Sequence, residues 1–336
     1  MIYTDLQTER MLAVLDQVSA QTNSTQQTIE KDWWVTQVLR VLFSLPYAEH
    51  LSFKGGTSLS KAWSIIERFS EDIDIAISRE FLGFVGELSR TQVSDKLRRA
   101  ACSFVREKMQ YDLRGGLIAL GIAPEKFNVY VNITSVSTTD PEVIYIDYES
   151  VLPYSEYIAH TVKVEVGGRS MAEPVQSVSI QSQIDAVLSQ ATFVQPAFEV
   201  NVVVPERTFL EKLMLLHEEF AKPMTEVRTE RMSRHLYDLQ RMLHTSIAQR
   251  ALSDEALYRA VVEHRRKFIN LRDFDYDTLY PKHLSLEIPA NVLELWRKDY
   301  ETMQRTMIYG QSVAFDELLA EIRQLNLRIS ELPYQK

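Results

Sequence analysis

The sequence is poor in the residues that mark disulfide-rich, collagen-like and membrane-spanning chains. Its 336 residues include one cysteine, Cys102, with 10 glycines and 11 prolines. One cysteine excludes an internal disulfide and a cysteine-rich metal site, and the surrounding VSDKLRRAACSFVREKM predicts a buried helix residue. Apolar stretches such as residues 198–204 are interrupted by Asn, Glu or Pro well before the roughly 20 residues that a bilayer span needs. We therefore expect no membrane span and no thiol redox chemistry.

Positive charge is also scarce. The chain has 46 acidic and 37 basic residues and a formal net charge of −9. Proteins that coat nucleic acid non-specifically depend on many Lys and Arg side chains, so any nucleic-acid site here must be local. The first residues, MIYTDLQTERML, lack the apolar core of a secretory signal, and we expect a cytoplasmic protein.

The remaining composition is that of a packed globular protein. Hydrophobic residues make up 45% of the chain and charged residues 25%, and 336 residues exceed what one hydrophobic core normally supports. Apolar periodicity predicts helices from residue 207 to about 270 and from 290 to 330, whereas β-rich runs precede Pro205. We therefore predict two domains, 1–205 with mixed α/β structure and N-terminal helices, and 206–336, mainly helical.

A glycine turn occurs early in the first domain. Residues 51–53 are typical of a short strand, and Lys54-Gly55-Gly56-Thr57 of a turn that follows it. From Ser58 the apolar spacing predicts a helix, with Thr57 or Ser58 as its N-cap. Backbone N–H groups in such a turn can hold phosphate groups, and a Thr or Ser hydroxyl can add to them.

An acidic strand follows the turn. Residues 72–77, Asp-Ile-Asp-Ile-Ala-Ile, alternate strictly, which puts Asp72 and Asp74 on one face of a sheet. Two carboxylates this close favour a divalent cation, and oxygen ligands indicate Mg²⁺. Further strands are expected near 128–136, 143–151 and 160–166. A third carboxylate is expected from Glu165 or from Asp147, and the cleaner apolar alternation around Glu165 favours it.

These motifs carry a family resemblance. EKDWWVTQVLRVLF and LSFKGGTSLSKAWSIIERFSEDIDIAI, then VKVEVGGRS, VVVPERTFLEKLMLLHEEF and RHLYDLQRM, resemble the nucleotidyltransferase-like AbiEii/AbiGii toxin family, related to the MenT toxins within the DNA polymerase β superfamily. The resemblance covers roughly residues 25–245. It implies a nucleotidyltransferase-fold mixed sheet with flanking helices. The expected site residues are, for the triphosphate, Lys54, Gly55, Gly56, Thr57 and Ser58, and for Mg²⁺, Asp72, Asp74 and Glu165.

The resemblance adds residues from the second domain. It implies that Lys212 and Asp238 are needed for activity, and Lys212 could reach a nucleotide phosphate. Arg231, Arg234 and Arg241 share a helical face with Asp238, which makes Arg234 a candidate for phosphate contact. By helical spacing alone, Lys212 lies off the buried stripe of its helix, and a surface ion pair with Glu211 is the plain alternative. Likewise, Asp238 either neutralises Arg234 or orients an arginine or a hydroxyl during transfer. The cationic run at 264–267 is either an RNA contact or a charged helix end.

The resemblance also implies a function. We expect a Mg²⁺-dependent toxin nucleotidyltransferase of a toxin–antitoxin or phage-defence system, which transfers NMP from an NTP to RNA, most specifically to the 3′ end of tRNA. A cognate antitoxin protein is the expected partner. Two alternatives stay open: transfer to a protein or small-molecule hydroxyl, and a catalytically silent nucleotide-binding module.

Overall fold

In the computed structural model the chain forms two compact units. The structure describes residues 1–22, 24–70, 72–132, 141–154 and 159–334. The first unit comprises Met1–Ala62 and Phe69–Val203, and the second comprises Trp63–Arg68 and Val204–Lys336. The short segment 63–68 therefore belongs to the helical unit although it lies between the glycine turn and the acidic strand, an arrangement that the sequence analysis did not anticipate.

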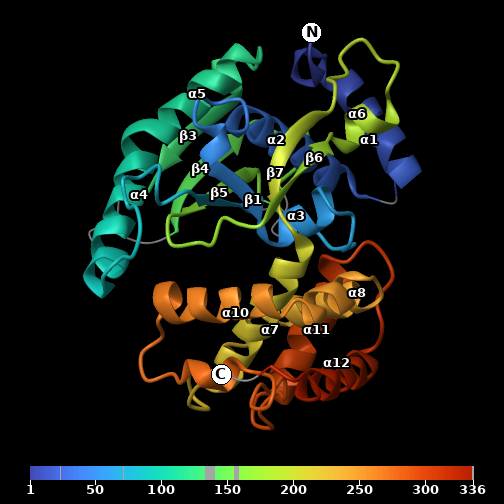
Figure 1. Cartoon of the computed structure of the whole chain (residues 1–336). Helices are drawn as coiled ribbons and strands as arrows, with labels where there is room; N and C mark the ends of the chain where they lie inside the picture. Colours follow the sequence, from blue (N-terminus) through green and yellow to red (C-terminus); the bar gives the residue numbers. More distant parts are fainter. Residues whose placement is uncertain (23, 71, 133–140, 155–158, 335–336) are drawn as a thin grey trace. The chain divides into compact units, whose positions relative to one another are not determined.

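The first unit is built on a mixed sheet (Figure 1). In the described residues, seven strands have the order β3-β4-β5-β2-β1-β7-β6. The strands are β1 Leu51–Lys54, β2 Asp72–Ile77, β3 Phe127–Val131, β4 Glu142–Tyr148, β5 Thr161–Gly167, β6 Val175–Ile180 and β7 Phe198–Val203. β2 is parallel to β5 and antiparallel to β1, so the central strands run in both directions. The predicted strand at 128–136 ends as β3 at Val131, and residues 133–136 lie outside the described residues.

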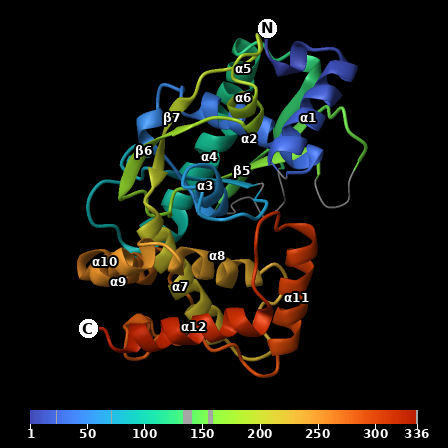
Figure 2. The same ribbon diagram turned by 90° about the vertical axis from the view of Figure 1, so that its right-hand side faces the viewer.

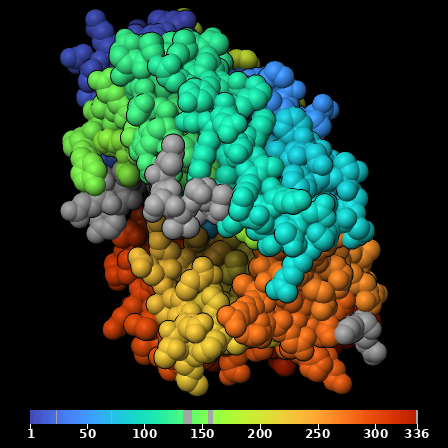
Figure 3. All heavy atoms as spheres, turned by 90° about the vertical axis from the view of Figure 1, so that its left-hand side faces the viewer, coloured from blue at the N-terminus to red at the C-terminus, as the bar shows by residue number. Residues whose placement is uncertain are grey.

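Helices accompany this sheet. They are α1 Thr8–Thr22, α2 Gln26–Leu42, α3 Gly55–Lys61, α4 Arg98–Phe104, α5 Gln110–Ala119 and α6 Gln183–Val187, with short turns η1 Tyr3–Asp5, η2 Ala48–His50 and η5 Pro124–Lys126. The π-helical segments η3 Gln92–Leu97, before α4, and η4 Val105–Met109, between α4 and α5, make residues 92–119 one continuous helical stretch. Its side chains, cyan to green, form much of the first unit's surface in Figure 3. Cys102 is buried in α4, as predicted.

One face of the sheet is apolar and carries the core. Ile73 and Ile75 of β2 and Val162, Val164 and Val166 of β5 are fully buried. α2 covers this face, and its Trp34 stacks on Tyr148 of β4 with ring centroids 4.9 Å apart. Alternation of apolar and polar residues leaves the opposite face for polar side chains.

The second unit is helical in its described part. Its elements are α7 Pro205–Phe220, α8 Ser233–Leu243, α9 Ile247–Ser253, α10 Glu255–His264, η6 Arg265–Ile269, η7 Tyr276–Leu279, α11 Leu293–Thr306 and α12 Phe315–Ser330. Figure 2 shows α7, α8, α11 and α12 of this unit from the side. Pro205 occupies the first turn of α7, where its missing N–H costs no hydrogen bond. No helix in the described ranges is long and apolar enough to cross a membrane.

Candidate active site

Three neighbouring strands bring two carboxylates and a lysine side by side. Asp74 of β2 is paired with Lys54 of β1 on one side and with Glu165 of β5 on the other. Directly paired residues point to the same face of a sheet, from strands about 4.8 Å apart. Asp72, two residues before Asp74, shares that face and is paired with Lys163. The structure therefore gathers the three predicted metal ligands on the polar face of the sheet.

Glu165, and not Asp147, is the third carboxylate beside the acidic strand. Asp147 of β4 is paired with Thr161, and the Thr161 hydroxyl donates a 2.6 Å hydrogen bond to its Oδ1. β4 lies beyond β5 in the strand order, so Asp147 is one strand farther from Asp74 than Glu165 is. The alternation of Val162, Val164 and Val166 is the sequence signal that favours Glu165.

The electrostatics of this face are those of a crowded acidic site. Burial raises the pKa of Glu165 to about 6, and the charges of Asp74 and Asp72 act in the same direction. Lys54 and Lys163 act in the opposite direction without cancelling the effect. A carboxylate with a pKa near neutrality is suited to accept a proton at physiological pH.

The donor chemistry fits Mg²⁺. Asp72, Asp74 and Glu165 offer oxygen atoms only, and their mutual repulsion, visible in the raised pKa of Glu165, would be relieved by a cation. Across the described residues, no three His, Cys, Asp or Glu side chains form a ready-made metal cage. Mg²⁺ is commonly held by one or two carboxylates together with substrate phosphates, so such a cage is not required.

Gly55 makes room for the Asp74 carboxylate. Its φ of +81° lies in the left-handed region, and a β-carbon placed on it would be 1.9 Å from Asp74 Oδ2. No residue with a side chain can therefore replace Gly55 while Asp74 stays in place. Glycine at position 55 is therefore needed for two reasons: the left-handed backbone of the turn, and the close packing of that turn against Asp74 of the acidic strand.

The helix after the turn differs from the prediction. α3 begins at Gly55, with Lys54 as its N-cap, and ends at Lys61, so the expected N-caps at Thr57 and Ser58 are wrong. Both side chains are buried: the Thr57 hydroxyl donates to the Asp72 carbonyl oxygen at 2.5 Å, and the Ser58 hydroxyl to the Gly55 carbonyl oxygen at 2.9 Å. The Thr57 bond ties the turn to β2, whereas the Ser58 bond lies within the first turn of α3. Contact of either hydroxyl with phosphate stays a prediction.

The second unit holds a buried ionic cluster. Asp238 of α8 is fully buried and accepts hydrogen bonds from Arg68 Nε and Nη2 at 2.7 and 2.8 Å. Lys212 of α7 lies 2.9 Å from Asp238 Oδ2. Burial acts to raise the pKa of Asp238, but Arg68 and Lys212 outweigh it and hold that pKa well below its usual range. Burial of the Lys212 ammonium group lowers its pKa, although the negative charge of Asp238 acts to raise that pKa.

These contacts correct two interpretations of the helices. Lys212 is buried instead of lying on an open face, and Glu211 pairs with Arg207. Asp238 forms ion pairs with Arg68 and Lys212, two partners that helical spacing did not predict.

Three further side chains of α8 lie close to this cluster or to Glu67, the neighbour of Arg68 in the sequence. Arg234 is half-buried, and its charge, after burial and the charge of Lys212, helps to lower the pKa of His235. His235 Nδ1 lies 3.4 Å from Lys212 Nζ. Arg241, also on α8, pairs with Glu67 at 3.0 Å.

Arg68 is the residue that the sequence analysis missed. It stands in the apolar context Ile65-Ile66-Glu67-Arg68-Phe69, and an arginine among buried apolar residues signals a buried counter-charge.

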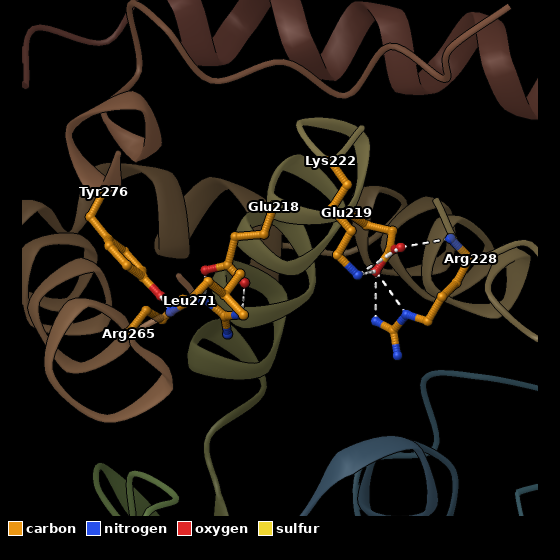
Figure 4. Close-up of polar contacts among 7 residues, drawn as sticks. All are labelled: Glu218, Glu219, Lys222, Arg228, Arg265, Leu271 and Tyr276. Atoms are coloured by element: carbon orange, nitrogen blue, oxygen red, sulfur yellow. Dashed lines mark hydrogen bonds and ion pairs between the residues drawn. The ribbon is translucent and has the colours of Figure 1, made fainter. Parts of the chain in front are cut away.

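The cationic run at 264–267 does not present all its charges to solvent. Arg265 is buried, and its Nε donates to Glu218 Oε1 at 2.7 Å, as Figure 4 shows. In the same view, Glu219 accepts hydrogen bonds from Lys222 and Arg228 at the end of α7. The Arg265 guanidinium is therefore engaged in holding η6 against α7, and an RNA contact by the rest of the run stays a prediction.

The predicted site residues thus fall into two groups. The first unit contains Lys54, Gly55, Gly56, Thr57, Ser58, Asp72, Asp74 and Glu165, and the second contains Lys212, Arg234 and Asp238. Within each unit the structure brings the predicted residues together.

The chain is similar to a protein family and to several solved structures. A family model described as "Nucleotidyl transferase AbiEii toxin, Type IV TA system" matches residues 37–321. The comparison with curated proteins yields no match. Among solved structures, MenT4, a nucleotidyltransferase toxin from Mycobacterium tuberculosis H37Rv, has a TM-score of 0.52 and 17% identity, over 97% of this chain and 90% of that chain. JHP933 from Helicobacter pylori has a TM-score of 0.43 and 14% identity, over 91% of this chain and 93% of that chain.

The likeness to MenT4 shows the fold and confirms the predicted nucleotidyltransferase-type mixed sheet with flanking helices. The family model spans most of the chain and includes both groups of predicted site residues, whereas α1 and the first part of α2 precede it. The chain belongs to the AbiEii nucleotidyltransferase toxin family of type IV toxin–antitoxin systems.

Proposed function

We propose that this protein transfers a nucleoside monophosphate from an NTP to an RNA acceptor, the 3′ end of tRNA, with Mg²⁺. The observation that carries the proposal is the pairing of Asp74 with Glu165 on neighbouring strands, with Asp72 on the same face. This arrangement combines a carboxylate pair for the cation with a third carboxylate whose pKa, raised to about 6, suits a base.

Asp72 and Asp74 would hold Mg²⁺ beside the triphosphate. When bound, the cation neutralises phosphate charge and stabilises the charge that develops on the leaving group. The backbone of Gly55 and Gly56, with Lys54, binds the triphosphate beside this pair. The closeness of the Gly55 backbone to Asp74 supports this division of roles, because it puts the turn directly against the carboxylate.

Glu165 acts on the acceptor. It takes the proton from the acceptor 3′-hydroxyl, whose oxygen attacks the α-phosphorus. A new P–O bond forms to that oxygen, the bond between the α-phosphorus and the oxygen bridging to the β-phosphorus breaks, and pyrophosphate leaves. The product carries a phosphodiester. Lys54 and Lys163 keep part of Glu165 ionised, because their charges lower its pKa against the effect of burial.

Lys212 and Arg234 of the helical unit bind nucleotide phosphates in this proposal. Asp238 acts as a positioning residue, because its carboxylate is buried and holds the Lys212 ammonium group at 2.9 Å. Arg68 completes the cluster, since it supplies the second counter-charge that Asp238 needs at full burial.

In the cell, extension of the tRNA 3′ end would block aminoacylation and stop growth. The family membership implies an antitoxin partner, and we propose that this antitoxin restrains the transfer activity in the cytoplasm, with phage infection as one condition for its release.

The test is a transfer assay with the full chain. The purified protein is incubated with each of the four α-labelled NTPs, MgCl₂ and total tRNA, and the RNA 3′ ends are sequenced. We expect label to enter tRNA from at least one NTP, and EDTA to abolish transfer. Asp74→Asn should lower the rate at least about a hundredfold, because loss of a metal ligand removes several kcal/mol of stabilisation.

Glu199→Gln is the matched control, because Glu199 lies on β7 of the same sheet, where its carboxylate accepts a hydrogen bond from the Ser177 hydroxyl, and it is not paired with Asp74. Its transfer rate should stay within about threefold of wild type. Label that enters protein or small molecules while tRNA stays unlabelled would contradict the proposed acceptor.

A further inference from the structure

Beyond the carboxylates, the polar face of the sheet continues as a row of four residues. Asp72 of β2 is paired with Lys163 of β5, Lys163 with Tyr145 of β4, and Tyr145 with Tyr130 of β3. Because paired residues share a face, this row runs from the acidic strand to the β3 edge of the sheet. The row contains in sequence a carboxylate, a cation and two aromatic rings.

The two tyrosines form an ordered pair. Their ring centroids are 5.4 Å apart with an interplanar angle of 14°, which is an offset stack. Both side chains are half-buried. Tyr130 also has a hydrogen bond with Asp147, the same carboxylate that accepts from Thr161. The Tyr130 ring is thus held in place by Asp147, and part of the surface of both rings stays accessible.

This pair does not belong to the hydrophobic core. The core side of the sheet at these strands is formed by Phe127 and Tyr148, on which Trp34 of α2 packs. Tyr130 and Tyr145 alternate with those residues and lie on the opposite face. Two aromatic rings on the polar face, next to a lysine, have no packing role that the core explains.

The tyrosine pair and the glycine turn lie on opposite sides of the acidic strand β2, which leaves room for the NTP on one side and the RNA acceptor on the other. The glycine turn follows β1, which lies on one side of β2, whereas the tyrosine pair lies on the other side, beyond β5. Tyr145 is two strands from Asp72, about 10 Å at the usual strand spacing. A single nucleotide covers such a span, with its base over the rings, its phosphate near Lys163 and its 3′-oxygen near Glu165.

We propose that Tyr130 and Tyr145 form a stacking platform for the base of the 3′-terminal nucleotide of the RNA acceptor, with Lys163 contacting its phosphate. The inference rests on the proposed function, since it takes the triphosphate to occupy the β1 side. Stacking on aromatic rings accepts any base, so the platform positions the acceptor end without selecting its sequence.

The test measures coupling between a ring and a base. The probe is a fluorescently labelled RNA minihelix with a single-stranded 3′ end, and a second RNA lacks only the terminal base. Anisotropy titrations without NTP give the Kd of each RNA for wild type and for Tyr145→Leu. We expect removal of the base to weaken wild-type binding about tenfold or more, and Tyr145→Leu to cause a similar loss.

The decisive result is the double change. If base and ring contact each other, either single change already removes the whole contact. The Kd of Tyr145→Leu for the minihelix without its base should then equal the Kd of either singly changed complex. Tyr145→Phe keeps the ring and should stay within about twofold of wild type. Losses that multiply, or a wild type that binds both RNAs equally, would overturn the platform. Tyr130→Leu repeats the cycle if Tyr145→Leu fails to fold.

Two further measurements separate this inference from the proposed function. Tyr111→Leu changes an exposed tyrosine of α5, outside the sheet, and should leave RNA binding unchanged. In the transfer assay with total tRNA, Tyr145→Leu should raise the KM for tRNA and leave the KM for NTP unchanged. Wild-type transfer to tRNA without ring–base coupling would refute the platform alone, whereas no wild-type transfer to RNA would refute the proposed function.

Discussion

Asp74 Oδ2 occupies the space that a β-carbon on Gly55 would need, at 1.9 Å from that position. We therefore expect Gly55→Ala to displace the Asp74 carboxylate, to abolish nucleotide transfer and to lower the melting temperature. Part of that loss comes from the positive φ of Gly55, which is +81°. An alanine in such a conformation costs about 1–2 kcal/mol by itself.

Gly83→Ala is the control for this backbone effect. Gly83 has a similar φ of +87°, and nothing lies within 4 Å of the position of its β-carbon. Thermal unfolding should show a smaller loss for Gly83→Ala than for Gly55→Ala, with transfer activity retained. Equal losses in both variants would mean that the contact with Asp74 has no role.

Removal of the buried carboxylate in the second unit should destabilise the protein strongly. Asp238→Asn leaves Arg68 and Lys212 buried without their counter-charge, and breaking such a cluster costs about 3–5 kcal/mol. Chemical denaturation measures this cost. Asp316→Asn breaks the exposed ion pair of Arg297 and Asp316 and should change the stability little. A small effect at both positions would show that the buried cluster is dispensable.

The pKa of Glu165 predicts a pH-dependent stability in metal-free buffer. Its folded-state pKa is about 6 and its ordinary value is 4.5, so the neutral carboxyl is the form that the fold favours. This contribution is present below pH 4.5 and is lost as the pH rises through about 6. Melting temperatures measured from pH 4 to 8 should show this loss in wild type and not in Glu165→Gln.

The same measurement tests for the cation. Mg²⁺ favours the ionised carboxylates, so its addition should restore wild-type stability above pH 6 and leave Asp74→Asn unaffected. A wild-type melting temperature that changes with neither pH nor Mg²⁺ would contradict the assignment of Asp72, Asp74 and Glu165 as a cation site.

Arg265 should matter for stability and not for RNA. Because its guanidinium is buried against Glu218, Arg265→Leu should lower the melting temperature while the dependence of RNA binding on salt stays unchanged. Loss of a phosphate contact would reduce the salt slope by about 1. A reduced slope would therefore show that Arg265 reaches RNA after all.

The sheet and its acidic residues could be predicted from the sequence because strict alternation specifies a face. Residues 72–77 and 160–166 each contain apolar residues at every second position, and one face of each strand had to be polar. The pairing of Asp74 with Glu165 was not readable in this way. Strand order and register depend on contacts between distant segments, and alternation within one strand does not specify its neighbour.

The helices of the second unit illustrate what periodicity misses. The apolar spacing of Phe209, Leu213, Leu216 and Phe220 indicates a buried stripe on α7; the first three are buried and Phe220 is half-buried, but Lys212 is buried as well. A charged residue can be buried when distant residues supply its counter-charge, and those residues, Asp238 and Arg68, lie far from it in sequence. Helical spacing reports local neighbours only, which explains why Glu211 and Arg234 were the expected partners.

The membership of residues 63–68 in the helical unit bears on how this protein can be dissected. A fragment that stops at Val203 would retain Arg68 but lack Asp238, its buried counter-charge. The Arg68 guanidinium and the apolar side chains of Ile65 and Ile66 would then lose their burial against the second unit's helices. In the sequence, residues 63–68 lie between the glycine turn and the acidic strand β2. Expression of the sheet unit alone would therefore disturb the segment between the glycine turn and β2, and we expect only the full chain to hold both motifs in place.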